Sequence, residues 1–167
     1  SYRSTPLGLA EVTLSRKDPA YVGRAKAVQA EEAARRAGQG DAALLAKIRA
    51  VPGCEALTWD DVQLASTIFA VKPGDGSARE QAASCQRVLG GAANFACEYA
   101  TKRYRSNCIN WGMLPFLVEN PGALDNGDYV YLPGVRKALL EAADELNAVA
   151  IKPDGGLVKF IQPLSRR

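Results

Sequence analysis

The sequence predicts an α/β fold with antiparallel additions, and three patterns along the chain support this prediction. Helical patterns fill the first third, short apolar runs alternate with helical segments in the middle, and two strand-like arms flank a proline- and glycine-rich tetrapeptide near the end. Strands that alternate with helices are typical of a parallel sheet, whereas a tight reversal pairs two strands antiparallel. The 167 residues suffice for a hydrophobic core, and we expect one domain over residues 1–167.

The first third of the chain predicts two helices. Asp18-Pro19 is typical of an N-cap followed by proline at the first helical position, and the alanine-rich stretch after it reaches Ala37. Asp41 is placed to cap a second helix that runs to about Val51, where a Pro-Gly pair ends it. We therefore expect a helical hairpin over residues 18–52.

The middle of the chain predicts strands and helices in alternation. A β-favouring apolar run closed by proline or glycine indicates a buried strand, and apolar residues three and four positions apart indicate a helix. The expected strands are 66–71, 92–97, 114–118 and 129–132, and the expected helices are 78–89, 99–110 and 133–146. The last helix would place Val135, Leu139, Ala142 and Leu146 on one face.

The C-terminus predicts a β-hairpin. Its arms, residues 148–152 and 157–163, flank Pro153-Asp154-Gly155-Gly156, which has the residue types that a tight reversal requires. This hairpin is the antiparallel addition to the expected sheet.

The composition excludes several classes of function. The 21 basic and 18 acidic residues give a net charge of +3 without an extended basic run, which does not favour nucleic-acid binding. No apolar run approaches the length of a membrane span, so we expect a soluble protein with no membrane partner. The wide spacing of the cysteines favours reduced thiols and hence a cytoplasmic location. The chain has no histidine, which removes Ser-His and Cys-His catalysis and the usual zinc ligands.

The positions of the four cysteines do not favour a metal site, and three of them are expected in the core. They are widely spaced, with no CxxC pair, which is unlike a zinc site or a secreted disulfide scaffold. Cys85 and Cys108 fall on expected helices and Cys97 closes an expected strand, all common settings for a buried free cysteine. We therefore expect reduced thiols and no metal bound by this chain.

The segment Gly74-Asp75-Gly76-Ser77-Ala78-Arg79-Glu80 is the candidate site, because it joins an expected strand to an expected helix. Its glycines allow close approach by a ligand, and the first-turn N–H groups and helix dipole favour an anion. Ser77-x-x-Glu80 matches a capping box, yet the same N–H groups would also stabilise a deprotonated serine oxygen. Arg79 is either a solvated surface residue or a two-pronged ligand for a carboxylate.

Two ordered motifs carry a resemblance to a known superfamily. Residues 74–83, GDGSAREQAA, and 89–91, LGG, resemble the Gly-x-Gly-Ser-Ser-Arg-Glu-His-Ala and Leu-Gly-Gly pattern of the aconitase and isopropylmalate dehydratase superfamily. Residues 107–115, NCINWGMLP, are similar to the Asn-x-x-Asn-x-Gly-Leu segment of its small subunits. Ala78 stands where the superfamily commonly has a second serine and Gln81 where it commonly has histidine, so the substrate is left open.

The resemblance implies both a fold and a site. The fold is a three-layer β/β/α swivelling domain with a mixed, partly parallel sheet, which closes over a 4Fe-4S cluster bound by a separate cluster-bearing domain or large subunit. Ser77 takes the position of the catalytic base and Arg79 that of the ligand to the substrate carboxylate. Backbone N–H groups from Gly76 to Arg79, including that of Ala78, would stabilise the serine alkoxide.

The sequence leaves two functions open. The first is the swivel domain of an aconitase-like hydro-lyase, a divergent hydratase that dehydrates and rehydrates a small hydroxy-carboxylic acid. The second is a non-enzymatic anion-binding or regulatory module with the same fold. An upstream reading frame or neighbouring gene with a lone cysteine and a later CxxC pair would favour the enzyme, because three thiolates leave one iron open.

Overall fold

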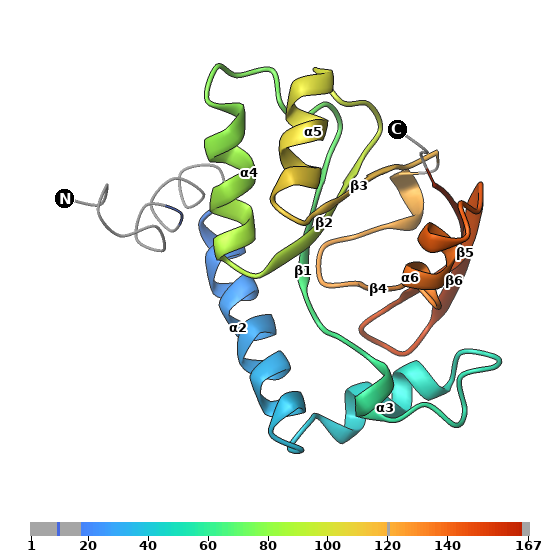
Figure 1. The fold of residues 1–167 in the computed structure, drawn as a ribbon. Helices are drawn as coiled ribbons and strands as arrows, with labels where there is room; N and C mark the ends of the chain where they lie inside the picture. The colour runs from blue at the N-terminus through green and yellow to red at the C-terminus, as the bar shows by residue number, and fades with distance from the viewer. Residues whose placement is uncertain (1–9, 11–17, 120, 165–167) are drawn as a thin grey trace. The chain divides into compact units, whose positions relative to one another are not determined.

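The computed structural model describes residue 10, residues 18–119 and residues 121–164. These residues include five α-helices and six strands in two three-stranded sheets (Figure 1). They group into two compact units, the first drawn from 1–40 and 63–115 and the second from 41–62 and 116–167. The mixed α/β class is confirmed, but parallel and antiparallel strands lie in separate sheets rather than in the one mixed sheet that we expected.

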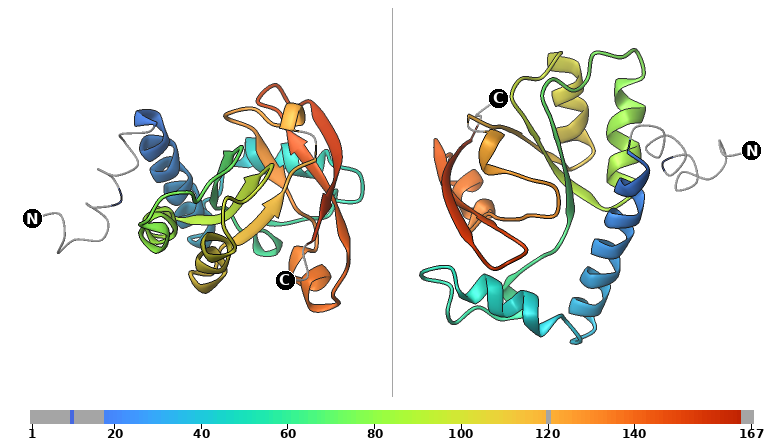
Figure 2. Two further views of the ribbon diagram at one scale, coloured as in Figure 1. Left: turned by 90° about the horizontal axis from the view of Figure 1, so that it is seen from above. Right: turned by 180° about the vertical axis from the view of Figure 1, so that it is seen from behind.

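The parallel sheet follows the alternation of strands and helices in the sequence. Its strands are β1 (Ser66–Ala70), β2 (Gly91–Ala96) and β3 (Leu114–Leu117), in that order across the sheet. The crossovers are α4 (Arg79–Val88) and α5 (Lys102–Asn110), which lie side by side on one face (Figures 1 and 2). Because each helix runs back against its strand, both helices begin at the carboxyl edge of the sheet.

Helix α2 (Pro19–Arg36) belongs to the first unit and packs its apolar side against residues of α4 and β1. It begins as the sequence predicts, with Asp18 Oδ1 accepting a hydrogen bond from Ala20 N at 3.1 Å. Tyr21 and Ala25 then join Cys85 of α4 and Leu89, the residue that ends this helix, in a buried core.

A carboxylate on α2 ties this helix to the chain before β1. Glu32 accepts two hydrogen bonds of 2.7 Å from Arg35 and one of 2.8 Å from Leu64 N. These bonds, led by the Arg35 pair, lower the pKa of Glu32 from 4.5 to about 2. The side chain is only 12% exposed, so the link is a structural one.

The second unit is built around an antiparallel sheet of β4 (Tyr129–Tyr131), β5 (Glu145–Ile151) and β6 (Leu157–Pro163), in that order. Residues 148–151 of its middle strand are buried. The helices of this unit are α3 (Ala42–Arg49), η2 (Trp59–Asp61), η3 (Pro121–Ala123) and α6 (Val135–Leu140).

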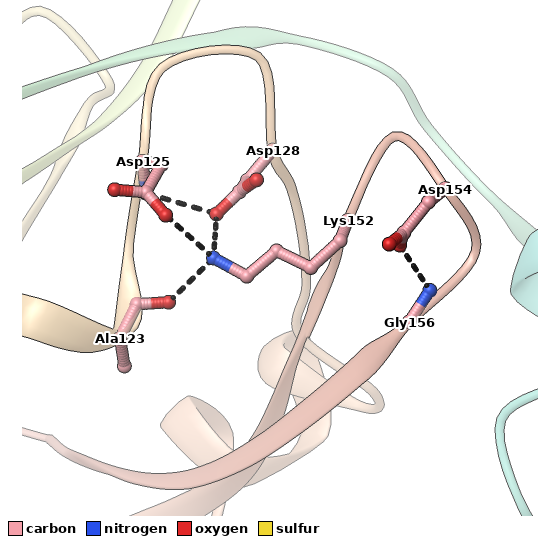
Figure 3. A network of polar contacts seen from close by, with 6 residues as sticks. All are labelled: Ala123, Asp125, Asp128, Lys152, Asp154 and Gly156. Carbon is pink, nitrogen blue, oxygen red and sulfur yellow. Dashed lines mark hydrogen bonds and ion pairs between the residues drawn. The ribbon is translucent and has the colours of Figure 1, made fainter.

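The predicted C-terminal hairpin is confirmed, and a lysine at its turn anchors a neighbouring loop. Figure 3 shows Lys152 Nζ donating to the Ala123 carbonyl at 3.0 Å, to Asp125 at 3.2 Å and to Asp128. Asp154 in the turn accepts from Gly156 N at 2.8 Å. The bond to Asp128, above all, raises the pKa of Lys152. Lys152 therefore has acceptors for its charge within the protein, and its role is structural.

Two helical expectations need correction or refinement. The helix expected over 133–146 is wrong beyond α6, because Ala142 adopts a positive φ of 52° and Leu146 lies in β5. Strand pairing decides this, since β5 is in register with β6 from Glu145 opposite Pro163 onward. Helices α2 and α3 form where the hairpin over 18–52 was expected, but they belong to different compact units. Across the described residues, every helix is too short or too polar to cross a membrane.

Candidate functional site

The candidate site lies in the segment 71–78, which leaves the carboxyl end of β1 and enters α4. In open parallel sheets, ligands bind outside the carboxyl ends of the strands, where loops meet the N-termini of the crossover helices. The predicted site residues Gly76, Ser77 and Ala78 lie in this segment, and Arg79 is the first residue of α4. The fold therefore brings them to the edge of the sheet where a ligand is expected.

Helix α4 begins without a side-chain cap. Its N-cap residue is Ala78, whose side chain has no oxygen, and its first backbone hydrogen bond runs from Ala82 N to Ala78 O at 3.0 Å. The capping-box interpretation of Ser77 and Glu80 is therefore wrong, because the helix starts one residue later than that pattern requires. The N–H groups of the first turn have no acceptor within the helix and retain their partial positive charge.

Ser77 stands directly before this uncapped turn. Ser77 is exposed, as are its neighbours Gly76 and Ala78. Among the described residues no hydrogen bond is made by the Ser77 hydroxyl, so nothing in that part of the chain uses it structurally. Ser77 precedes the N-cap residue Ala78, so the N–H groups of the first turn of α4 are the donors nearest in sequence that could stabilise its deprotonated form.

Arg79 carries a cation into the first turn of α4, where the helix dipole disfavours it. The side chain is half-buried, and its Nε is fully buried without a hydrogen-bond partner among the described residues. A buried donor without a partner costs about 1–3 kcal/mol, more for a charged group. An incoming carboxylate would offset this cost and the unfavourable dipole together, because a guanidinium binds carboxylates through two parallel hydrogen bonds.

The cysteines are mostly core residues, as predicted, with one exception. Cys85 packs in the core with Leu89, and Cys108 packs with Met113. Cys54 is also buried, in the second unit. Cys97 is exposed, which corrects the expectation of a core residue: it follows the last residue of β2, at a bend beyond the strand. In the part of the chain that the structure describes, no three metal-ligating side chains come together.

The sequence interpretation missed the residues that hold the segment from behind. Thr101, the N-cap of α5, and Tyr104 in its first turn both contact Gly74. Burial raises the pKa of Tyr104 and of Tyr99 above the ordinary value of a tyrosine, so both hydroxyls stay protonated at neutral pH. The sequence shows a glycine after a proline at Gly74 and an N-cap residue type before a helix at Thr101. Neither pattern reveals that Thr101 forms a hydrogen bond with Gly74.

A separate cavity lies within the second unit and contains none of the predicted site residues. Its volume is about 470 Å³, and it lies between residues 51–54 and strands β5 and β6. Val51, Cys54, Pro133, Val149 and Ile161 contribute to its mainly apolar lining. Lys159 is the charged residue of this lining, and its side chain is exposed.

The chain matches no protein-family model, and no curated protein is significantly similar to it. The aconitase-like motifs, and the partner and cofactor that they imply, therefore stay predictions.

Proposed function

We propose that this chain is the substrate-binding swivel domain of an aconitase-like hydro-lyase that dehydrates and rehydrates a small hydroxy-carboxylic acid. One arrangement carries the proposal, and it lies at the carboxyl edge of the parallel sheet, where α4 begins without a side-chain cap. Ser77, just before this helix start, is exposed and its hydroxyl makes no hydrogen bond in the described chain. Arg79, the first residue of the helix, has a buried Nε without a hydrogen-bond partner there. The missing cap and the buried donor each cost stability, and a carboxylate substrate would offset both. The order of the two aconitase-like motifs supports the same conclusion.

In this proposal Arg79 orients the substrate. Its guanidinium binds one carboxylate with two hydrogen bonds, and the partial positive charge of the first turn of α4 favours the same anion. We infer that a carboxylate held by Arg79 presents its adjacent carbon to Ser77, which precedes Arg79 by two residues. Lysine would keep the charge but lose the paired geometry.

Ser77 acts as the base. In the dehydration direction its deprotonated oxygen takes the proton from the carbon next to the carboxylate, and the electron pair of that C–H bond forms the double bond as hydroxide leaves the neighbouring carbon. The chain has no histidine to assist the serine, so the N–H groups from Gly76 to Arg79 must stabilise the alkoxide. One such donor is worth roughly 3 kcal/mol in comparable oxyanion sites.

The departing hydroxyl needs help that this chain does not provide. A 4Fe-4S cluster held by a partner domain or subunit would supply a Lewis acid for that oxygen. Within the described residues the thiols of Cys54, Cys85 and Cys108 are buried and do not converge, so they fit cores rather than a cluster. The surface that carries Ser77 and Arg79 is open and fits a site completed by closure onto a partner.

Turnover and substrate affinity in the complete enzyme test the proposal. Ser77→Ala should lower kcat at least about 100-fold, the usual minimum for a general base, with little change in stability because its hydroxyl makes no bond in the described chain. Arg79→Lys should raise KM about tenfold. Ser84→Ala and Arg87→Lys are the controls, since Ser84 bonds Gln81 O within α4 and Arg87 bonds Gly91 O at the other end of this helix.

The outcomes separate the enzyme from the alternative module. Wild-type turnover in Ser77→Ala would remove the serine base, and a wild-type KM in Arg79→Lys would make Arg79 a surface residue. If the chain binds citrate through Arg79 but no cluster-bearing partner encoded beside it yields hydration of an unsaturated acid, the anion-binding module is the better description.

A further inference from the structure

The segment that carries Ser77 is anchored over its first part by the loop that follows β2. Glu98 N donates to Val71 O and Ala100 N donates to Pro73 O, each at 3.0 Å. These bonds continue the pairing of the parallel strands β1 and β2 beyond their carboxyl ends. Up to Pro73, the path of the segment is therefore fixed by the sheet.

Gly74 is the last anchored residue before Ser77. Its φ of +93° is a conformation that residues with a side chain rarely adopt, and a Cβ there would lie 2.4 Å from Cβ and Cγ of Tyr104. Tyr104 is 6% exposed, and its hydroxyl accepts a hydrogen bond of 3.0 Å from Asn94 Nδ2 of β2. The Gly74 backbone thus packs against a buried tyrosine side chain that is held in place by its hydrogen bond to Asn94.

Thr101 holds Gly74 against this tyrosine. Its hydroxyl donates to the Gly74 carbonyl at 3.3 Å and accepts from Tyr104 N at 3.1 Å, so one oxygen both caps α5 and binds the segment. Beyond Gly74, residues 75–77 make no hydrogen bond within the described chain, and the next fixed point is Ala78 O in the first turn of α4. Ser77 stands in the short free span between these two points.

We propose that Thr101 is a positioning residue for the site: through its bond to Gly74 it sets the direction in which the segment leaves the sheet and hence where Ser77 stands. Thr101 is well placed for this role because it is the N-cap of α5, whose start lies at the same edge of the sheet as the start of α4. Catalytic geometry is sensitive to displacements of about 1 Å, so a loosened Gly74 affects Ser77 without any change in the serine itself. The inference rests on the proposed function for the catalytic role of Ser77 and for the carboxylate at Arg79.

The test separates the bond to Gly74 from the cap of α5. Thr101→Ser keeps both interactions, and Thr101→Val loses both. Thr101→Asp keeps an acceptor for Tyr104 N, and aspartate is a good N-cap, but an ionised carboxylate has no proton to donate to Gly74. Thr58→Val, at the start of η2 in the second unit, is the matched control because Thr58 bonds Asp61 at a helix start there.

The measurement is the order of the segment in the ¹⁵N-labelled chain, read from the heteronuclear NOE at Gly76, Ser77 and Ala78. Thr101→Val and Thr101→Asp should both lower these values, while Thr101→Ser and Thr58→Val leave them at the wild-type level. With citrate as the probe, the Kd of Thr101→Val should rise about five-fold, the loss of one hydrogen bond, and Thr101→Ser should restore it. Denaturation midpoints measured on the same samples confirm that each variant is folded.

Failure of this inference and failure of the proposed function look different. Wild-type NOE values in Thr101→Asp, with lowered values in Thr101→Val, would reduce Thr101 to a cap of α5 and overturn the proposal. A wild-type chain that binds no citrate would instead count against the carboxylate site, and the NOE values would still decide the role of Thr101.

Discussion

Replacement of Gly74 by alanine should destabilise the first unit by about 3 kcal/mol, the sum of backbone strain and steric overlap. A residue with a Cβ at a positive φ costs roughly 1–2 kcal/mol. The new Cβ would also lie 2.4 Å from two atoms of Tyr104 that are close to the backbone of α5 and cannot rotate away. Overpacking of this kind typically adds about 1–3 kcal/mol.

Two further glycines in the same unit separate these two costs. Gly112 has a φ of +75° and open space within 4 Å of the position that a Cβ would take, so Gly112→Ala should show strain alone, about 1 kcal/mol. Gly76 has neither a positive φ nor a neighbour within 4 Å, and Gly76→Ala should change the free energy of unfolding by less than about 1 kcal/mol in either direction. The expected order of destabilisation is Gly74, then Gly112, then Gly76.

Tryptophan fluorescence during urea unfolding can report on the first unit alone. The chain has two tryptophans, Trp111 in the first unit and Trp59 in the second, so a Trp59→Phe background leaves Trp111 as the probe. The free energy of unfolding follows from linear extrapolation, and equal slopes across variants confirm that the same surface is exposed. If Gly74→Ala costs no more than Gly112→Ala, the packing of Tyr104 on Gly74 is not present in solution, and the positioning of Ser77 through Gly74 loses its basis.

Two other predictions concern acid stability and the cluster. The hydrogen bonds from Arg35, above all, lower the pKa of Glu32 from 4.5 to about 2. The Glu32 carboxylate therefore stabilises the folded state fully at pH values above 4.5, and this stabilisation is lost as the pH falls from 4.5 toward 2. Glu32→Gln should therefore lower the free energy of unfolding by about 2–3 kcal/mol at neutral pH. Urea unfolding measured between about pH 5 and pH 2 should then show a smaller loss of stability with acid in Glu32→Gln than in the wild type, whereas Glu145→Gln, at an exposed residue, should behave like the wild type. Supplied with iron and sulfide under reducing, anaerobic conditions, the chain alone should hold no stable iron–sulfur cluster, since three of its four cysteines are buried. A stoichiometric cluster with visible absorption would contradict the division of the site between this chain and a partner.

The elements that the sequence predicted correctly have strong local signals. The Asp18-Pro19 start of α2 and the turn of the C-terminal hairpin depend on residues whose own backbone preferences select the structure. The alternation of β1, α4, β2 and α5 was equally visible, because apolar runs closed by glycine or proline mark each boundary. Local sequence signals therefore suffice to predict an element where the residues themselves strongly favour one backbone conformation.

The errors arose where distant partners decide the structure. Residues 135–146 carry a helical apolar pattern, but pairing of β5 with β6 takes Leu146 into a strand. The division of the strands into two sheets depends on pairing between segments far apart in the chain, which no local pattern encodes. The contact between Gly74 and Tyr104 has the same origin, since it exists only when β1 and β2 are paired.

The position of the helix start is the feature that most changes the interpretation of the site. A serine at the N-cap would use its oxygen to accept an N–H group, and that oxygen would then be engaged in stabilising the helix. Because Ala78 occupies the N-cap instead, the oxygen of Ser77 and the N–H groups of α4 are not consumed by each other. The missing cap costs the helix about 1 kcal/mol, and the charge of Glu80 in the first turn offsets only part of this cost. A helix start without a side-chain cap, beside an Arg79 Nε that lacks a partner in the described chain, supports the proposed anion site.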